Sequence, residues 1–114
     1  MRGKNLKTMN EINLSEIEII PVKPRNGLLA FSSFVLNNSF YVGSVAIYSR
    51  FFEDGYRLVY PEKVLANGYK VSCFHPINSQ VAKQIEEKII STYENLIEKA
   101  KKKEEVNGSY PKIS

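Results

Sequence analysis

Apolar and charged residues alternate along the segment from Ser15 to Val22. This period of two predicts a β-strand with one face exposed to water. Because Pro21 has no N–H group to donate to a neighbouring strand, we expect this strand to lie at the edge of a sheet or to end there. Asn26 and Gly27 follow it and predict a tight turn, since both residues readily adopt a positive φ.

Two longer apolar runs follow, Leu28–Leu36 and Phe40–Tyr48, separated by Asn37-Asn38-Ser39. This spacing predicts a β-hairpin with a three-residue loop. Strict alternation places apolar residues on both faces of the first strand, with Leu29, Phe31 and Val35 on one face and Leu28, Ala30, Phe34 and Leu36 on the other. A sheet that is apolar on both faces needs a cover on each.

Two shorter strands are predicted next. Tyr56–Tyr60 follows a reversal at Glu53-Asp54-Gly55, and Tyr69–Phe74 follows an excursion at Pro61–Gly68. Hairpin-length connections join all these segments, so the sequence predicts a mostly antiparallel sheet of about five short strands.

From Val81 onward the apolar residues recur at helical spacing. They are Val81, Ala82, Ile85, Ile89, Tyr93, Leu96, Ile97 and Ala100. Asn78 or Ser79 can cap the helix start, and several lysines near its end oppose the helix dipole. We therefore predict an α+β fold with one long C-terminal helix at about Ser79–Lys103. One helix covers only one face of the sheet, so we expect a second copy of the chain to cover the other, which makes a homodimer.

The polar ends of the chain contain too few apolar residues to offset the entropy lost on ordering. We expect a flexible N-terminal segment at residues 1–13, one folded domain at residues 14–103 and a disordered tail at residues 104–114. The sequence has no apolar core of a secretory signal and no apolar run of membrane-spanning length. Cys73 is the only cysteine. These features favour a soluble protein of the reducing cytoplasm, with no membrane partner.

Candidate catalytic chemistry is sparse. His75 is the only histidine, and it lies two residues from Cys73 with no orienting acid nearby in the sequence. We favour a structural interpretation, with Cys73 packed in the core and His75 hydrogen-bonded at the junction between strand and helix. One histidine and one cysteine cannot form a structural zinc site, and the glycines form no phosphate-binding loop. We expect no enzyme activity, no bound metal and no cofactor.

The segment His75-Pro76-Ile77-Asn78-Ser79, between the last strand and the helix, resembles the most recognisable motif of the SpoVG (stage V sporulation protein G) family. Pro61-Glu62-Lys63 is similar to a Pro-Ser-Lys element of that family, and Asn67-Gly68 to its Asp-Gly turn. The resemblance extends over about Leu14–Leu96. Glu62, Val64 and Val81 depart from the family pattern and make the surface less basic.

The resemblance implies an antiparallel sheet with a C-terminal helix, a dimer, and sequence-selective DNA or RNA binding that regulates genes in sporulation and septation. A net charge of +4 and a pI of about 9.2 permit phosphate binding without requiring it. We therefore expect a nucleic-acid-binding regulatory protein. The alternative is a protein-interaction adaptor in septation or cell division that does not bind nucleic acid.

The candidate nucleic-acid-binding residues lie on or beside loops of the sheet and early in the helix. They are Arg50, Arg57, Lys63, Lys70 and Lys83. Arginine suits bidentate contacts to phosphate or guanine, which favours Arg50 and Arg57. Arg57 could instead pair with Glu53 or Asp54 on the surface. The aromatic residues near these arginines could stack on single-stranded bases, although we favour the interpretation that they fill the core and an interface. The lysines at 101–103 are a second candidate site. His75, Pro76, Asn78 and Ser79 are expected to be structural.

Overall fold

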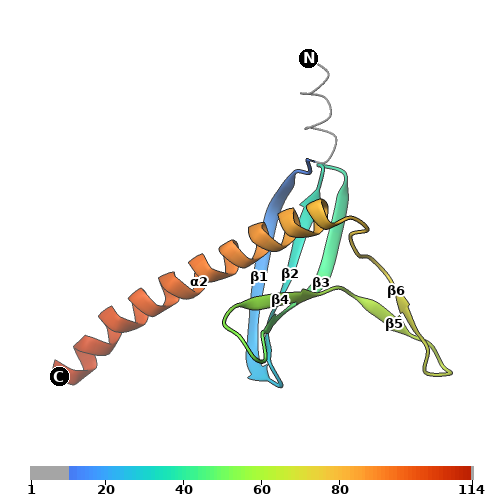
Figure 1. The fold of residues 1–114 in the computed structure, drawn as a ribbon. Helices are drawn as coiled ribbons and strands as arrows, with labels where there is room; N and C mark the ends of the chain where they lie inside the picture. The colour runs from blue at the N-terminus through green and yellow to red at the C-terminus, as the bar shows by residue number, and fades with distance from the viewer. Residues whose placement is uncertain (1–10, 114) are drawn as a thin grey trace, which may run out of the picture.

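The computed structural model describes residues 11–113, and the side chains of residues 11–103. This part of the chain forms an α+β fold, as predicted (Figure 1). Its elements are β1 (Leu14–Arg25), β2 (Leu28–Leu36), β3 (Phe40–Ser49), β4 (Tyr56–Val59), β5 (Glu62–Val64), β6 (Lys70–Ser72) and α2 (Ser79–Ile113). The expected division into two flexible ends and one domain stays a prediction, and residues 1–10 lie outside the described residues.

The main sheet has four antiparallel strands in the order β1-β2-β3-β4. β1 is an edge strand, as Pro21 predicted. Asn26 and Gly27 form the predicted turn with φ values of 54° and 88°, and Arg25 lies opposite Leu28. A two-residue hairpin loop of this kind requires positive φ at both positions, which explains the Asn-Gly pair. The predicted hairpin between β2 and β3 is also present.

A β-bulge in β2 changes which side chains share a face. Leu28 lies opposite Tyr48 and Ala30 lies opposite Ile47, so Leu29 is an extra residue between the two pairs. Leu29 packs against the core, whereas Leu28 lies on the face that carries Phe31. The strict alternation expected from the sequence, with Leu29 beside Phe31 and Leu28 beside Ala30, was therefore wrong at this end of the strand.

The core lies between one face of the main sheet and α2. Its buried members are Ala30, Phe34, Val42, Val45, Ile47, Ile85, Ile89 and Tyr93. Tyr93 also makes an edge-to-face contact with Tyr56 of β4, with ring centroids 5.2 Å apart. Figure 1 shows α2 crossing the sheet and continuing well beyond β1. The helix starts at the predicted Ser79 but ends at Ile113 and not at Lys103.

β5 and β6 form a separate two-stranded ribbon, so the strands are divided between two sheets, whereas the sequence predicted about five strands in one. β5 lies within the segment interpreted as an excursion, and the last predicted strand is reduced to Lys70–Ser72. The ribbon projects from the main sheet on the side away from the C-terminal end of α2 (Figure 1). Cys73, at the end of this ribbon, is exposed, and the expectation that it packs in the core was wrong.

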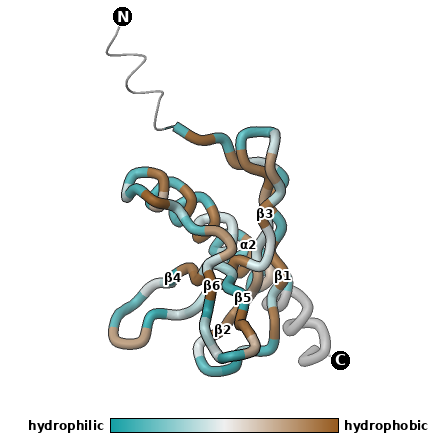
Figure 2. The backbone as a smooth tube through the Cα atoms, turned by 90° about the vertical axis from the view of Figure 1, so that its right-hand side faces the viewer, coloured by the Kyte–Doolittle hydropathy of each residue, from teal (hydrophilic) through white to brown (hydrophobic). Residues whose placement is uncertain are grey.

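The face of the sheet opposite α2 also carries apolar residues. Ile20, Phe31, Ala46 and Val59 are paired with one another in one row across all four strands. Ile20 is 60% exposed and Phe31 is 38% exposed. Figure 2 shows hydrophobic stretches along β1 and β3. The apolar content on both faces of the sheet is therefore a feature of the fold, and one face has no cover within the described residues.

Candidate nucleic-acid interface

The motif from His75 to Ser79 determines where α2 begins. The side-chain Oδ1 of Asn78 accepts a hydrogen bond from the backbone N–H of Val81 at 2.8 Å. This is the N-cap arrangement, which satisfies one of the free N–H groups of the first helical turn. Pro76 is half-buried just before the cap, and Ser79 is the first helical residue. His75 Nδ1 lies 2.6 Å from Ser72 Oγ, so His75 links the ribbon to the start of the helix.

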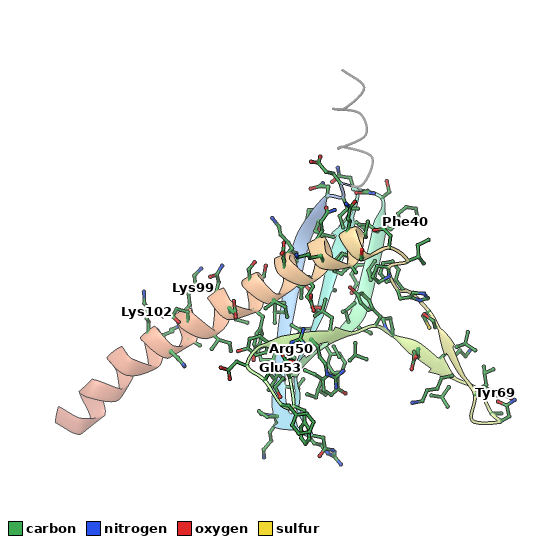
Figure 3. The ribbon with its side chains drawn as sticks, in the orientation of Figure 1. Phe40, Arg50, Glu53, Tyr69, Lys99 and Lys102 are labelled. Atoms are coloured by element: carbon green, nitrogen blue, oxygen red, sulfur yellow. The ribbon has the colours of Figure 1, made fainter. Side chains whose placement is uncertain are left out.

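Arg50 follows β3, and its side chain contacts residues of β4 and α2 (Figure 3). Its Nε donates a hydrogen bond to the carbonyl oxygen of Tyr56 at 3.2 Å. Its guanidinium lies 3.9 Å from the carboxylate of Glu86, and both side chains are 40% exposed. Glu87 and Glu94 line the same shallow hollow. Arg50 thus pairs with one carboxylate of α2, and two more line the hollow beside it, which disfavours the approach of a phosphate.

Arg57 has different surroundings on β4. Its guanidinium lies 4.8 Å from the centre of the Tyr48 ring, which is a cation–π contact. Among the side chains that the structure describes, no carboxylate lies within ion-pair distance of Arg57, so the alternative pairing with Glu53 or Asp54 does not form. Arg57 therefore forms no ion pair with the described side chains, and its own side chain is exposed.

Arg57 belongs to a row that crosses the uncovered face of the sheet. Arg25 lies opposite Leu28, Leu28 opposite Tyr48, and Tyr48 opposite Arg57. Side chains directly opposite each other in antiparallel strands share a face. The row thus has an arginine at each end, roughly 14 Å apart at a strand spacing of about 4.8 Å. Arg25 is not among the residues predicted from the sequence, although its place directly before the Asn-Gly turn predicts a position at this end of the sheet.

Lys83 and Arg57 line one hollow of about 360 Å³ between β4 and α2. Tyr60 and Glu86 line it too. Burial raises the pKa of Tyr60 to about 12, and the negative charge of Glu86 adds to this effect. Of the five predicted basic residues, Arg57 and Lys83 thus line the same hollow, and Glu86 lines both this hollow and the one beside Arg50.

Lys63 and Lys70 lie on the ribbon and point to its two faces. Lys63 is opposite Val71, whereas Lys70 is opposite Val64, so each face of the ribbon carries one lysine and one valine. All four side chains are exposed. The ribbon therefore has no face on which the two lysines add their charges, and neither lysine joins Arg57 or Lys83 in the hollow.

Two aromatic residues at a loop tip are a further feature of this region. Phe51 and Phe52 lie between β3 and β4 and are 89% and 91% exposed. The interpretation of aromatic residues as core fits Phe34, which is buried, and Tyr56 and Tyr60, which pack against the core. It does not fit the loop phenylalanines. Full exposure of a phenylalanine forgoes about 1.5–3 kcal/mol of burial energy, which favours a functional role for the pair.

The family model for SpoVG matches residues 12–95, which is most of the chain. The chain belongs to the SpoVG family. The match to the SpoVG model includes the whole main sheet, the ribbon and the first part of α2. The resemblance deduced from the motif His75–Ser79 is thereby confirmed.

No curated protein matches this SpoVG-family chain. In the part of the chain that the structure describes, no group of three or more His, Cys, Asp or Glu residues is arranged to hold a metal ion. Within the same residues, no helix is both long and apolar enough to cross a membrane.

Proposed function

We propose that this SpoVG-family protein binds nucleic acid, DNA or RNA, and regulates gene expression. Membership of the family points to a role related to sporulation and septation. The observation that carries the nucleic-acid proposal is Arg57, an exposed arginine that stacks on Tyr48 without a carboxylate partner among the described side chains. We propose a non-catalytic, cytoplasmic protein that acts as a homodimer.

Arg57 would contact phosphates or guanine bases, because its guanidinium presents several donors in a fixed plane. Stacking on Tyr48 holds that plane in place. Arg25 would act at the other end of the same row, and Lys83 would add a charge from the helix side of β4. A dimer doubles each of these charges, so that a net charge of +4 per chain becomes sufficient for phosphate binding. Lys63 and Lys70 would extend the contact along the ribbon.

The alternative function is a protein-interaction adaptor that does not bind nucleic acid. The ribbon favours this alternative, because its exposed side chains include Val64, Tyr69 and Val71. Glutamates around Arg50 make part of the surface acidic, which also suits a protein partner better than a nucleic acid. Salt dependence separates the two functions, since phosphate contacts release counterions and impose a steep decrease of affinity with salt.

The test is a salt-titrated gel shift together with elution from heparin. Arg57→Glu is expected to weaken binding and to reduce the salt slope by about one for the lost phosphate contact, with the fold unchanged. Lys99→Glu makes the same charge change on the distal part of α2, where Lys99 is exposed (Figure 3), and serves as the matched control. Reversal of Arg50 is a poorer test, because its loss also removes the contacts to Tyr56 and Glu86.

Unchanged affinity in folded Arg57→Glu, with loss of binding in Lys99→Glu, would move the site to the lysines of the distal helix. No salt-dependent binding by the unmodified protein would favour the adaptor.

A further inference from the structure

Phe51 and Phe52 form a pair of exposed rings at the tip of the loop between β3 and β4. Their ring centroids are 4.6 Å apart, and the ring planes meet at 72° in an edge-to-face arrangement. With 89% and 91% of these residues exposed, the described part of the molecule covers neither ring. Both rings are therefore available to a ligand.

The base of this loop is held by hydrogen bonds. The backbone N–H of Arg50 donates to the carbonyl oxygen of Gly55 at 3.0 Å, and Gly55 adopts a φ of 110° that side-chain-bearing residues rarely reach. The backbone N–H of Ser49 donates to the carbonyl oxygen of Gly27 at 2.9 Å. These hydrogen bonds hold the two ends of the loop beside the turn between β1 and β2. Binding at the loop tip therefore costs little conformational entropy at the loop ends.

The same end of the sheet carries the row with two arginines. Tyr48 of this row directly precedes Ser49, and Arg57 directly follows Tyr56, so the row lies at the base of the loop. Arg25, at the other end of the row, flanks the turn that Ser49 contacts. The acidic residues here are Glu53 and Asp54 in the loop itself, together with Glu86, Glu87 and Glu94 of α2, which line the hollow beside Arg50 and Gly55. Positive charge therefore lies along the row, while the tip combines aromatic rings with negative charge.

We propose that this end of the sheet binds single-stranded nucleic acid, with unpaired bases stacked on Phe51 and Phe52 and phosphates held by Arg25 and Arg57. The inference rests on the proposed nucleic-acid binding and specifies the state of the strand. A ring can stack only on a base whose face is free, and in a duplex the neighbouring bases cover those faces. Glu53 and Asp54 repel phosphates from the tip, which directs the backbone of the strand toward the arginines.

The test compares a labelled mixed-sequence single strand with its duplex by fluorescence anisotropy, in both DNA and RNA. The double variant Phe51→Ala/Phe52→Ala is expected to bind the single strand at least about tenfold more weakly, as expected for the loss of one base stack. Its affinity for the duplex should stay within about twofold. Phe51→Tyr/Phe52→Tyr keeps both aromatic rings and is the matched control, with near-normal binding.

A second measurement uses the absence of tryptophan from the sequence. In Phe52→Trp the new indole is the single tryptophan of the chain, so its fluorescence reports directly on the tip. Addition of a single strand should quench it, and addition of the duplex should not. Because both side chains are exposed, none of these variants should change the thermal unfolding temperature.

The outcomes separate the two proposals. If the unmodified protein binds neither form, the nucleic-acid function fails and the strand assignment fails with it. If it binds and the alanine variant binds equally well, or loses both forms alike, the strand assignment alone is wrong. A change of oligomeric mass in the alanine variant, with unchanged binding, would assign the tip to a contact between copies of the chain and would also overturn the inference.

Discussion

Arg50 and Arg57 flank one reversal of the chain, yet the fold gives them opposite surroundings. Arg50 lies 3.9 Å from Glu86, whereas Arg57 stacks on Tyr48 at 4.8 Å and has no acid partner among the described side chains. The sequence predicted both as equivalent candidates, because the acids that compensate Arg50 come from the helix, far away along the chain. Arg57 could be predicted from its residue type and strand position, and Arg50 could be separated from it only once the packing of α2 on β4 was known.

Tyr60 predicts that the stability of the protein depends on pH. Its pKa is raised from 10.0 to about 12, first by burial and second by Glu86. The fold thus favours the neutral phenol, and the unfolded chain releases the proton at lower pH. The contribution of Tyr60 to the free energy of unfolding is fully present below pH 10 and decreases as the pH rises toward 12. Denaturant unfolding across this range should show the decrease, and Tyr60→Phe should reduce it.

Tyr93 adds a decrease of the same sign, because burial raises its pKa too, so the Tyr60→Phe variant retains part of the effect. Glu86→Gln removes the second cause and should bring the pKa of Tyr60 closer to 10.0 without reaching it. An identical pH profile for Tyr60→Phe and the unmodified protein would show that Tyr60 does not titrate in this way.

Hairpins and helix were predictable elements, because local residues determine them. Asn26-Gly27 gives the tight turn, and the three residues Asn37–Ser39 give the second hairpin loop with φ of 51° and 55° at its two asparagines. The ribbon was not predictable as a separate unit. Glu62, Lys63 and Val64 are all exposed. β5 therefore lacks the alternation of apolar and polar residues from which a half-buried strand is predicted. Tyr69, Val71 and Cys73 alternate as a half-buried strand would, but the ribbon carries them away from the core.

The residues at the start of α2 are predicted to contribute to the stability of the fold. Asn78→Ala removes the acceptor for the N–H of Val81 and should lower the free energy of unfolding by about 1 kcal/mol. Asn78→Asp keeps an acceptor oxygen and should retain most of the stability. His75→Ala loses the 2.6 Å contact to Ser72 and is expected to loosen the junction of ribbon and helix. Chemical denaturation followed by circular dichroism measures all three variants.

Full stability in either alanine variant, combined with loss of nucleic-acid binding, would transfer Asn78 or His75 from a structural to a binding role.

The described part of the molecule is elongated, and one face of its main sheet has no cover. Its principal extents are 63 × 49 × 30 Å, since α2 extends beyond the sheet on one side and the ribbon projects on the other. The need for a second cover was predictable from the apolar residues on both faces of β2. Which residues are involved was not, because the bulge at Leu29 exchanges the faces of Leu28 and Leu29.

The uncovered face of the sheet predicts that the protein forms a dimer. The apolar row of Ile20, Phe31, Ala46 and Val59 is expected to lie in the contact between two copies. Light scattering at micromolar concentration should give about twice the chain mass of 13.0 kDa. Phe31→Glu places a charge in the centre of the row and should give a folded monomer, since an unpaired charge in an apolar contact is costly.

Val64→Glu is the control for this prediction, because Val64 is an exposed apolar side chain on the ribbon, away from the row. A monomer with Val64→Glu and a dimer with Phe31→Glu would place the contact on the ribbon. A monomeric unmodified protein would contradict dimerisation altogether.

The irregularities of β1 have a consequence for how the protein behaves when concentrated. An open sheet edge exposes unpaired N–H and C=O groups, and such an edge can template strand addition and fibril growth. In β1, Pro21 and Pro24 each lack an N–H group, and Glu16, at a φ of 49°, interrupts the regular ladder near the start of the strand. We expect these features to divide the edge into short stretches that recruit a foreign strand poorly. The sheet would then offer an apolar face to a partner without inviting fibril growth along its long edge.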